Sequence, residues 1–312
     1  VTTFSAANAY DIRVTLVNVS HPQQIEQGTK HKGRLWLTHV TEVQGAGEPY
    51  SGTALLSIKG AATAQFHGGR PNVTALVRGR TVGVYSTTAV STVTFSQNPA
   101  WGILDYMTNS VYGMGPYIPP SAVDIQSFID FATLCQSQVP NGRGGLENQH
   151  NLDIVMDQKR SHWQWMQDIL GNYRSSLVFS QNRFKIITDR QDLPVRQVFH
   201  AGNMVLGATE IRIASDPTRP NQANVRFANQ SLDYEQDAIF VQNSASVFGA
   251  GDPIKDYDMN LIGIVRESEA IRTAAFDLNR KRQQRREMSF STGLEGIAVE
   301  PGDMCRAGVL FT

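Results

Sequence analysis

Charge of either sign is scarce in this sequence. Charged residues make up 18% of the 312, and 28 Lys+Arg balance 28 Asp+Glu, whereas soluble proteins average roughly 25% charged residues. A net charge of zero excludes a polybasic nucleic-acid binder as the default interpretation, and it excludes an acidic disordered protein. Neutral amides, 22 Gln and 17 Asn, replace the missing charge. This composition is typical of a surface committed to stable contacts with other chains, where charge is depleted.

Cysteine is also scarce, and long apolar runs are missing. Cys135 and Cys305 lie too far apart in the sequence for a disulfide framework or a zinc site, and we expect both to be buried thiols. No apolar stretch approaches the roughly 18 residues that cross a bilayer, so we expect no membrane span. The chain shows no signal peptide and starts at Val1 without Met, so we interpret it as a segment of a longer polypeptide.

Motifs for nucleophilic, phosphate-binding or zinc chemistry are absent. There is no Gly-x-Ser-x-Gly, no P-loop and no His-Glu-x-x-His. The glycine-rich stretch 142–145 follows an expected helix end, so it predicts an exit loop and not a phosphate cradle. The histidines lack the close spacing of helical metal ligands, and we expect them on the surface or in loops.

One stretch, residues 252–267, partly resembles a calcium loop. Asp256 and Glu267 stand at the first and last ligand positions, but Leu261 occupies the position where the sharp turn needs glycine. A polar loop is therefore the favoured interpretation, and a metal there stays open. Elsewhere we expect no catalytic, cofactor-binding or metal-binding residue.

The only basic cluster is formed by Arg280, Lys281, Arg282, Arg285 and Arg286. It could be a phosphate-contacting helix face, a solvated helix end or a contact with another subunit or the lumen of an assembly. Cations are favourable near a helix C-terminus, and aromatic residues for base stacking are not interleaved. The solvated helix end is therefore favoured, and the subunit contact remains open because Arg is enriched at interface cores.

The N-terminal part, residues 1–95, has the pattern of β-structure. Polar and apolar residues alternate at 11–17 and 34–40, and strands are also expected at 53–58 and 73–84. Strands at this spacing, separated by turns, predict a barrel or sandwich.

Residues 96–190 have the pattern of a helical insert that ends in a β-hairpin. Asn98 followed by Pro99 predicts a helix start. Ser121 and Asp124 form a capping-box variant that predicts a second helix from Ser121. A third helix is expected over 161–173, and a hairpin over 177–187.

Residues 191–312 return to the β pattern and include one long helix over 268–286, with Ile271, Ala274, Ala275 and Leu278 on its apolar face. A strand at 287–292 and a turn at Pro301-Gly302-Asp303 follow. The sequence therefore predicts an α+β fold. It contains two β-barrel or sandwich-like modules, 1–95 and 191–312, around a helical insert at 96–190.

Several short motifs occur in an order that resembles one protein family. Asn98-Pro99-Ala100-Trp101, Leu104-Asp105 and Tyr112-Gly113-Met114-Gly115 are followed by Val139 to Glu147 and by Pro301-Gly302-Asp303. This order, over about residues 50–305, is similar to the central tail hub, or tip attachment (host-specificity), proteins of long-tailed phages. Residues 1–50 and 216–265 match this pattern poorly. The motif residues are Asn98, Pro99, Trp101, Leu104, Asp105, Tyr112, Gly113, Gly115, Pro140, Gly142, Gly144, Gly145, Pro301, Gly302 and Asp303.

The resemblance implies a structural role without enzymatic activity or cofactors. Such hubs are homotrimers at the distal end of the tail tube, and their β modules resemble tube subunits. The implied partners are the tail tube or distal tail protein, the tape-measure protein, and fibre or spike proteins, with DNA only in transit. The implied location is the virion tail tip, after assembly in the bacterial host cytoplasm.

Two other functions remain open. A tail-associated cell-wall hydrolase would use a carboxylate pair drawn from Asp105, Asp124 and Glu147. A carbohydrate-binding module would expose aromatic rings among Trp36, Trp163 and Trp165, although tryptophans of this kind more often lie in the core.

Overall fold

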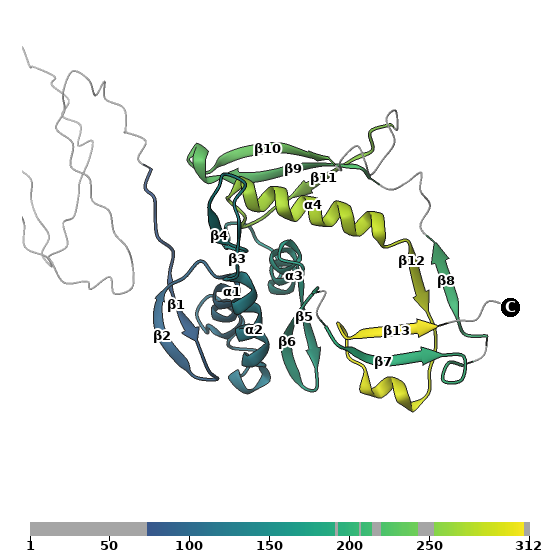
Figure 1. The fold of residues 1–312 in the computed structure, drawn as a ribbon. Coiled ribbons are helices and arrows are strands. Elements are labelled where there is room, and N and C mark those ends of the chain that lie inside the picture. The colour runs from purple at the N-terminus through teal and green to yellow at the C-terminus, as the bar shows by residue number, and fades with distance from the viewer. Residues whose placement is uncertain (1–73, 191–192, 206, 214–219, 243–252, 309–312) are drawn as a thin grey trace, which may run out of the picture. The chain divides into compact units, whose positions relative to one another are not determined.

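The computed structural model describes residues 74–190, 193–205, 207–213, 220–242 and 253–308 (Figure 1). The strands predicted at 11–17, 34–40 and 53–58 lie outside these residues. The chain divides into two units, Val1–Thr74 and Ala75–Thr312, and the second is described here. Its four α-helices and small sheets confirm the α+β class, and none of the sheets in its described part closes into a barrel.

The first described sheet is a hairpin that leads into the helices. β1 (Thr81–Tyr85) pairs antiparallel with β2 (Val90–Phe95), and helix α1 (Pro99–Thr108) follows. As predicted, Asn98 caps this helix. Its Oδ1 accepts from the Ala100 N–H at 3.0 Å. Its Nδ2 donates to the Ala132 carbonyl at 3.0 Å, which ties α1 to the next helix.

The end of α1 explains the two glycines of the Tyr112–Gly115 motif. The chain folds back so that the Met114 N–H donates to the Tyr106 carbonyl at 2.9 Å and the Gly115 N–H donates to the Asn109 carbonyl at 3.0 Å. These bonds satisfy carbonyls that a helix end leaves unpaired. A Cβ on Gly113 would lie 1.9 Å from the Tyr106 carbonyl oxygen, and one on Gly115 would lie 2.4 Å from that of Thr108. Only glycine allows this close approach.

The second helix starts later than the sequence predicts. α2 covers Ile125–Cys135, and Asp124 precedes it without a side-chain capping bond. Residues Pro120–Ala122 form a separate 3₁₀ turn, η2. The prediction of a helix from Ser121 is wrong because the Asp124 N–H donates to the Phe184 carbonyl of a distant strand, at 2.9 Å.

The glycine-rich stretch lies in a hairpin and not at a helix exit. β3 (Gln138–Pro140) pairs with β4 (Leu146–Asn148). The Asn141 side chain organises the loop between them by accepting from the N–H groups of Arg143 and Gly145, at 2.8 and 3.0 Å. Gly142 and Gly144 adopt positive φ there, 75° and 86°, a conformation that glycine adopts without strain.

The third helix and the following hairpin confirm their predictions. α3 covers His162–Asn172 and is capped by Ser161. β5 (Ser175–Ser180) and β6 (Arg183–Thr188) pair around Gln181 and Asn182. Both turn residues have positive φ, as a tight hairpin turn requires.

A three-stranded sheet covers one side of the long helix (Figure 1). Its central strand β9 (Gln222–Asn229) pairs antiparallel with β10 (Glu235–Gln242) and parallel with β11 (Asp256–Asn260), and the 3₁₀ turn η4 (Gln230–Leu232) connects β9 to β10. Alternate residues of β9 are buried, as expected for a strand with one covered face.

The long helix α4 covers Glu267–Gln283. It therefore ends before the predicted Arg286. Ala274 and Leu278 are buried as predicted, but Ile271 is exposed and does not belong to the apolar face. The stretch from Asp256 to Asn260 is strand β11, so the favoured interpretation of a polar loop is wrong there.

The remaining C-terminal strands form two small ribbons. β7 (Val195–His200) pairs parallel with β13 (Met304–Gly308), and β8 (Glu210–Ile213) pairs antiparallel with β12 (Arg286–Ser289). The 3₁₀ turn η5 (Leu294–Ala298) precedes β13. Cys135 is buried as predicted, whereas Cys305 in β13 is only half-buried.

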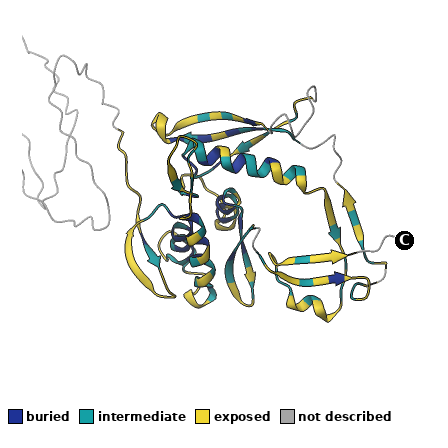
Figure 2. Ribbon diagram, viewed as in Figure 1, coloured by how far each residue is buried: buried dark blue, intermediate teal, exposed yellow. Residues whose placement is uncertain are grey.

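Burial is concentrated in the helices and in β9 (Figure 2). One apolar cluster joins α1, α2, α3, the β5–β6 hairpin, β9 and α4. In the described parts of 193–213 and 284–308, Phe199 is the one buried apolar side chain. The ribbons are therefore held mainly by backbone pairing, and not by a core of their own.

We predict opposite effects for one substitution at two glycines. Gly113→Ala should lower the free energy of unfolding by about 1–3 kcal/mol, the usual cost of overpacking, because its Cβ would overlap the Tyr106 carbonyl. Gly171→Ala, in α3 with no neighbouring atom within 4 Å, should raise it by about 0.5–1 kcal/mol. Urea unfolding followed by circular dichroism measures both, and equal effects would contradict the close approach at Gly113.

Candidate functional site

Two separate regions of the described structure gather polar side chains. The first is a set of ion pairs and hydrogen bonds at the start of α4, formed by Glu147, His150, Arg266, Glu269 and Arg272 and called the ion-pair network below. The second is an open cleft between α2, β6 and the turn that precedes β13.

Glu147 receives donors from the first turns of α4. Arg266 pairs with one of its oxygens at 3.1 Å, and the Ser268 hydroxyl donates to the other at 2.6 Å. Arg272 also pairs with Glu147. Burial alone would raise the pKa of Glu147, but the hydrogen bonds from Ser268 and Arg272 and the charge of Arg266 lower it below its ordinary value. Glu147 is therefore held as a carboxylate.

Glu269 is the buried member of the network. Its side chain is 1% exposed and pairs with Arg266 at 2.6 Å. His150 lies 3.1 Å away and donates from Nδ1, and the Asn151 N–H donates at 3.2 Å. Burial lowers the pKa of His150, although the hydrogen bond to Glu269 opposes that shift. His150 is consequently neutral near pH 7 in the folded protein.

The network fastens the chain after β4 along the start of α4. Arg266 and Arg272 also donate to the carbonyls of Asn148 and Gln149, both at 3.1 Å. Farther along, the Asp153 N–H donates to the Gly263 carbonyl at 3.0 Å. A Cβ at Gly263, where φ is +84°, would lie 2.6 Å from Leu152. Glycine is therefore required where these two segments meet.

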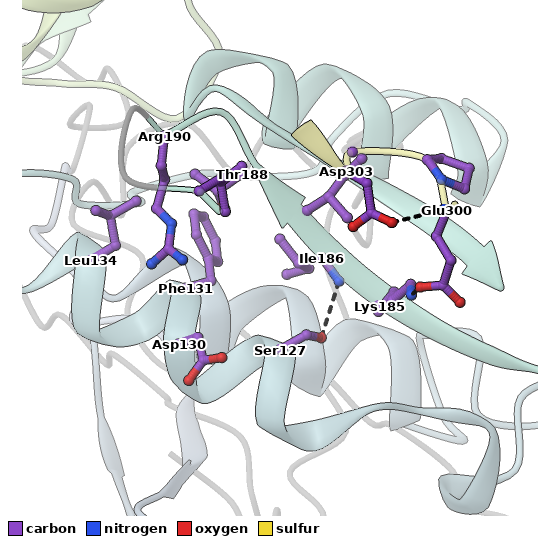
Figure 3. Close-up of a pocket in the computed structure, with 14 residues that line it drawn as sticks. Ser127, Asp130, Phe131, Leu134, Lys185, Ile186, Thr188, Arg190, Glu300 and Asp303 are labelled. Carbon is purple, nitrogen blue, oxygen red and sulfur yellow. Dashed lines mark hydrogen bonds and ion pairs between the residues drawn. The ribbon is translucent and has the colours of Figure 1, made fainter. Parts of the chain in front are cut away.

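The cleft has a volume of about 190 Å³ and combines an apolar floor with a charged rim (Figure 3). Its floor contains Phe131 and Ile186. The turn at Pro301-Gly302-Asp303 forms one wall, and a Cβ on Gly302 would lie 2.8 Å from Ile187. The charged side chains around the cleft are Asp130, Lys185, Arg190, Glu300 and Asp303.

Glu300 attaches that wall to the hairpin. It pairs with Lys185 and accepts from the Ser180 hydroxyl at 2.9 Å. The Asp303 carboxylate accepts from the Glu300 N–H at 2.9 Å, and the Asp303 N–H donates to the Glu300 carbonyl at 3.0 Å. The motif Pro301-Gly302-Asp303 therefore forms the predicted turn and fixes the shape of the cleft.

Comparison with known proteins links the chain to phage tails. Residues 161–307, a little under half of the chain, match a family described as putative phage tail protein. A tip attachment protein J of Escherichia phage SECphi27 is 29% identical over 212 residues, which cover 67% of this chain and 17% of that protein. The chain is related to phage tip attachment proteins. A tip attachment protein J of Escherichia phage SECphi4 is 25% identical over 210 residues, covering 67% and 18% of the two chains.

The chain therefore spans less than a fifth of the length of these tip attachment relatives. Two solved structures are similar over part of it. The virion of a native gene transfer agent particle matches with a TM-score of 0.47 at 14% identity, over 68% of this chain and 42% of that one. A tail protein from Neisseria meningitidis MC58 matches with a TM-score of 0.37 at 11% identity, over 53% and 50%.

The motif residues on which the sequence resemblance rests lie at three places. Asn98, Pro99, Trp101 and Leu104 form the start and buried face of α1, while Asp105 accepts a hydrogen bond from the Tyr112 hydroxyl. Pro140, Gly142, Gly144 and Gly145 lie in the β3–β4 hairpin. Pro301, Gly302 and Asp303 line the cleft. These residues position the backbone and the core.

The basic cluster is not one helix face. Asp277 pairs with Arg280 at 2.7 Å and with Lys281 at 2.9 Å. Lys281 also lies 3.3 Å above the ring of Tyr257. Arg285 lies beyond α4, and Arg286 begins β12. The helix therefore ends before Arg285 and Arg286, and Asp277 balances a single one of the five charges. Arg280, Arg285 and Arg286 are exposed, which agrees with the favoured solvated end.

Sequence reasoning missed the central residues of the network. His150 lies in a loop, as the sequence predicts, but its side chain is buried at 3% exposure and its partner Glu269 was not foreseen. Glu269 had no assigned role. The available signal was its position beside Ala270 on the buried side of α4, where an unpaired carboxylate is unfavourable.

The described residues contain no group of three or more His, Cys, Asp or Glu placed to hold a metal ion. Among the helices that they form, none is long and apolar enough to cross a bilayer.

We predict that the two glutamates at the start of α4 differ strongly in their effect on stability. Glu269→Gln should lower the free energy of unfolding by about 3–5 kcal/mol, because it leaves the largely buried Arg266 and Arg272 with one carboxylate, Glu147, between them. The matched control Glu267→Gln removes an exposed pair with Arg143 and should cost less than about 1 kcal/mol. Denaturant unfolding measures both, and a small effect at Glu269 would contradict the importance of the network.

Acid should weaken the fold through His150. Its pKa is lowered in the folded protein from 6.5, so the unfolded chain binds the proton first as pH falls. The free energy of unfolding should therefore stay level above about pH 6.5 and fall below it. The lowered pKa of Glu147 adds a further loss below about 4.5. His150→Asn should flatten the upper part of this dependence, as measured by urea titrations between pH 8 and 5.

An unchanged slope in His150→Asn would show that another group causes the acid sensitivity.

Proposed function

We propose that this chain is a structural subunit of a phage tail tip, part of the central hub that caps the tail tube. The observation that carries the proposal is the similarity to two tip attachment proteins over 67% of the chain. That share is larger than residues 161–312 contain, so the similarity extends upstream of the family match. The helices with the Asn98–Gly115 motif are consistent with it.

In this proposal three copies form a homotrimer at the distal end of the tail. The two β modules, 1–95 and 191–312, act as tube-like units around the helical insert at 96–190. The partners are the tail tube or distal tail protein, the tape-measure protein, and fibre or spike proteins. DNA passes only in transit, and the subunit assembles in the host cytoplasm before it resides in the virion tail tip.

The contacts of the candidate acids favour this role over cell-wall hydrolysis. Asp105 binds the Tyr112 hydroxyl, Asp124 precedes α2, and Glu147 is surrounded by arginines. Among the described residues no hydrogen bond or ion pair joins any two of these three. A general acid needs a raised pKa, whereas the pKa of Glu147 is lowered. A clearing band in a peptidoglycan zymogram, lost on Glu147→Gln, would instead favour the hydrolase.

A carbohydrate platform on α3 has less support. Trp165 is buried beneath Arg160, whose guanidinium lies 4.9 Å from the ring, while Trp163 is partly exposed. The two rings therefore do not form one open stacking surface, and Trp36 lies outside the described residues.

Antibody labelling of intact phage particles tests the proposal. Gold-labelled antibody against this chain should mark the distal end of the tail in negative-stain images. The same antibody absorbed with purified chain is the control and should leave no label. Label on the capsid or along the tail shaft would refute the placement.

A further inference from the structure

The loop between β3 and β4 contains an Asn-Gly pair, Asn141-Gly142, which occurs nowhere else in the sequence (Figure 1). Gly142, Arg143 and Gly144 are exposed to solvent. The side-chain carbon of an asparagine and the backbone nitrogen of the next residue can close a five-membered ring. Glycine in the second position leaves that nitrogen open to approach because it has no side chain. The pair is therefore a candidate for chemical modification by its own backbone.

Two backbone donors point at the oxygen of the Asn141 side chain. The Arg143 N–H donates to Oδ1 at 2.8 Å, and the Gly145 N–H donates to it at 3.0 Å. Residue 145 has to be glycine here, because a Cβ would lie 2.9 Å from the Asn141 Nδ2. Negative charge develops on Oδ1 when a nucleophile attacks Cγ, and fixed donors at these distances stabilise such an oxyanion. The loop thus favours the transition state of attack at Cγ.

The attacking nitrogen, that of Gly142, is available in the described structure. Its N–H donates to no other group there, so its deprotonation breaks no hydrogen bond. Gly142 has a φ of 75°, which glycine adopts without strain. The Asn141 N–H donates to the Gly145 carbonyl at 3.0 Å. The two ends of the loop are therefore held together while Gly142 lies exposed between them.

We infer that Asn141 is a modification site at which the folded loop promotes deamidation by water. Hydroxide takes the proton of the Gly142 N–H, and the nitrogen attacks Asn141 Cγ while charge develops on Oδ1. The Cγ–Nδ2 bond then breaks, and ammonia leaves with a proton from water. The resulting succinimide ring adds one water at either carbonyl and opens. The products are aspartate or isoaspartate at position 141, and the reaction requires no oxidant or reductant.

The two products differ in their effect on the loop. Aspartate keeps a side-chain oxygen for the N–H groups of Arg143 and Gly145. Isoaspartate adds one atom to the backbone and displaces these donors. Arg143 also pairs with Glu267 at the start of α4, at 2.7 Å. Isoaspartate formation should therefore loosen the contact between the tip of this hairpin and α4.

The rate of conversion in the folded and the unfolded chain tests the inference. The full chain is incubated near neutral pH, with and without enough urea to unfold it, and peptide mapping by mass spectrometry follows the loss of Asn141. We expect faster conversion in the folded chain, because the loop supplies the two donors that the unfolded chain lacks. Conversion that is equal or slower in the folded chain would overturn the inference.

Two substitutions of one residue isolate the contribution of the backbone donor. Arg143→Pro removes the N–H that donates to Oδ1, and Arg143 does not have a positive φ in the native loop. Arg143→Ala is the matched control, since it removes the same side chain but keeps the N–H. We expect folded Arg143→Pro to convert about fivefold more slowly than folded Arg143→Ala, which corresponds to about 1 kcal/mol.

Circular dichroism checks that both variants are folded before their rates are compared. Equal rates in the two folded variants would show that the Arg143 N–H does not assist the reaction, and would overturn the inference.

Discussion

The described structure depends on the largely buried ion-pair network at the start of α4. Glu147 and Glu269 share Arg266, and each has further donors, so the carboxylates are satisfied away from water. Burying such ions costs several kcal/mol each, and a buried pair is weak evidence for net stability. The main effect of the network is to fix the position of α4. Because Arg266 and Glu147 lie 119 positions apart, the network determines where α4 meets the helical insert, and an unpaired alternative arrangement would be much less stable.

The position of α4 then determines the position of the sheet that it covers. Its apolar side, with Ala274 and Leu278, packs against the buried residues of β9. Near its other end, Asp277 accepts from the Tyr257 hydroxyl of β11 at 2.5 Å and binds Lys281. Burial raises the pKa of Tyr257, and the hydrogen bond to Asp277 raises it further, so this phenol remains a donor. The helix is thus fixed to the insert at its start and to the sheet near its end, and it connects the two as one rigid element.

Local signals were readable from the sequence and long-range ones were not. The Asn98 cap and the hairpin over 177–187 depend on nearby residues, and both were predicted. The capping box at Ser121 failed because Asp124 pairs with Phe184, which is 60 positions away. His150 and Glu269 are 119 positions apart, so only the folded chain shows that they are partners. The role of the motif glycines could likewise not be predicted from the sequence. Their order indicated the family, but the contacts at Tyr106 and Ile187 that exclude a Cβ follow from the fold.

The C-terminal ribbons bury few of their own side chains. Two-stranded ribbons are at best marginal alone in water, and Phe199 is the single buried apolar side chain in the described residues of 193–213 and 284–308. Larger apolar side chains there, Ile213, Leu294 and Ile297, are exposed instead. Because the described residues bury so little here, these ribbons gain most from contacts with other polypeptide, and binding that favours the folded state stabilises it by mass action. The open state of the ribbons is therefore consistent with the proposed tail-tip role, in which contacts with other chains would complete the C-terminal part.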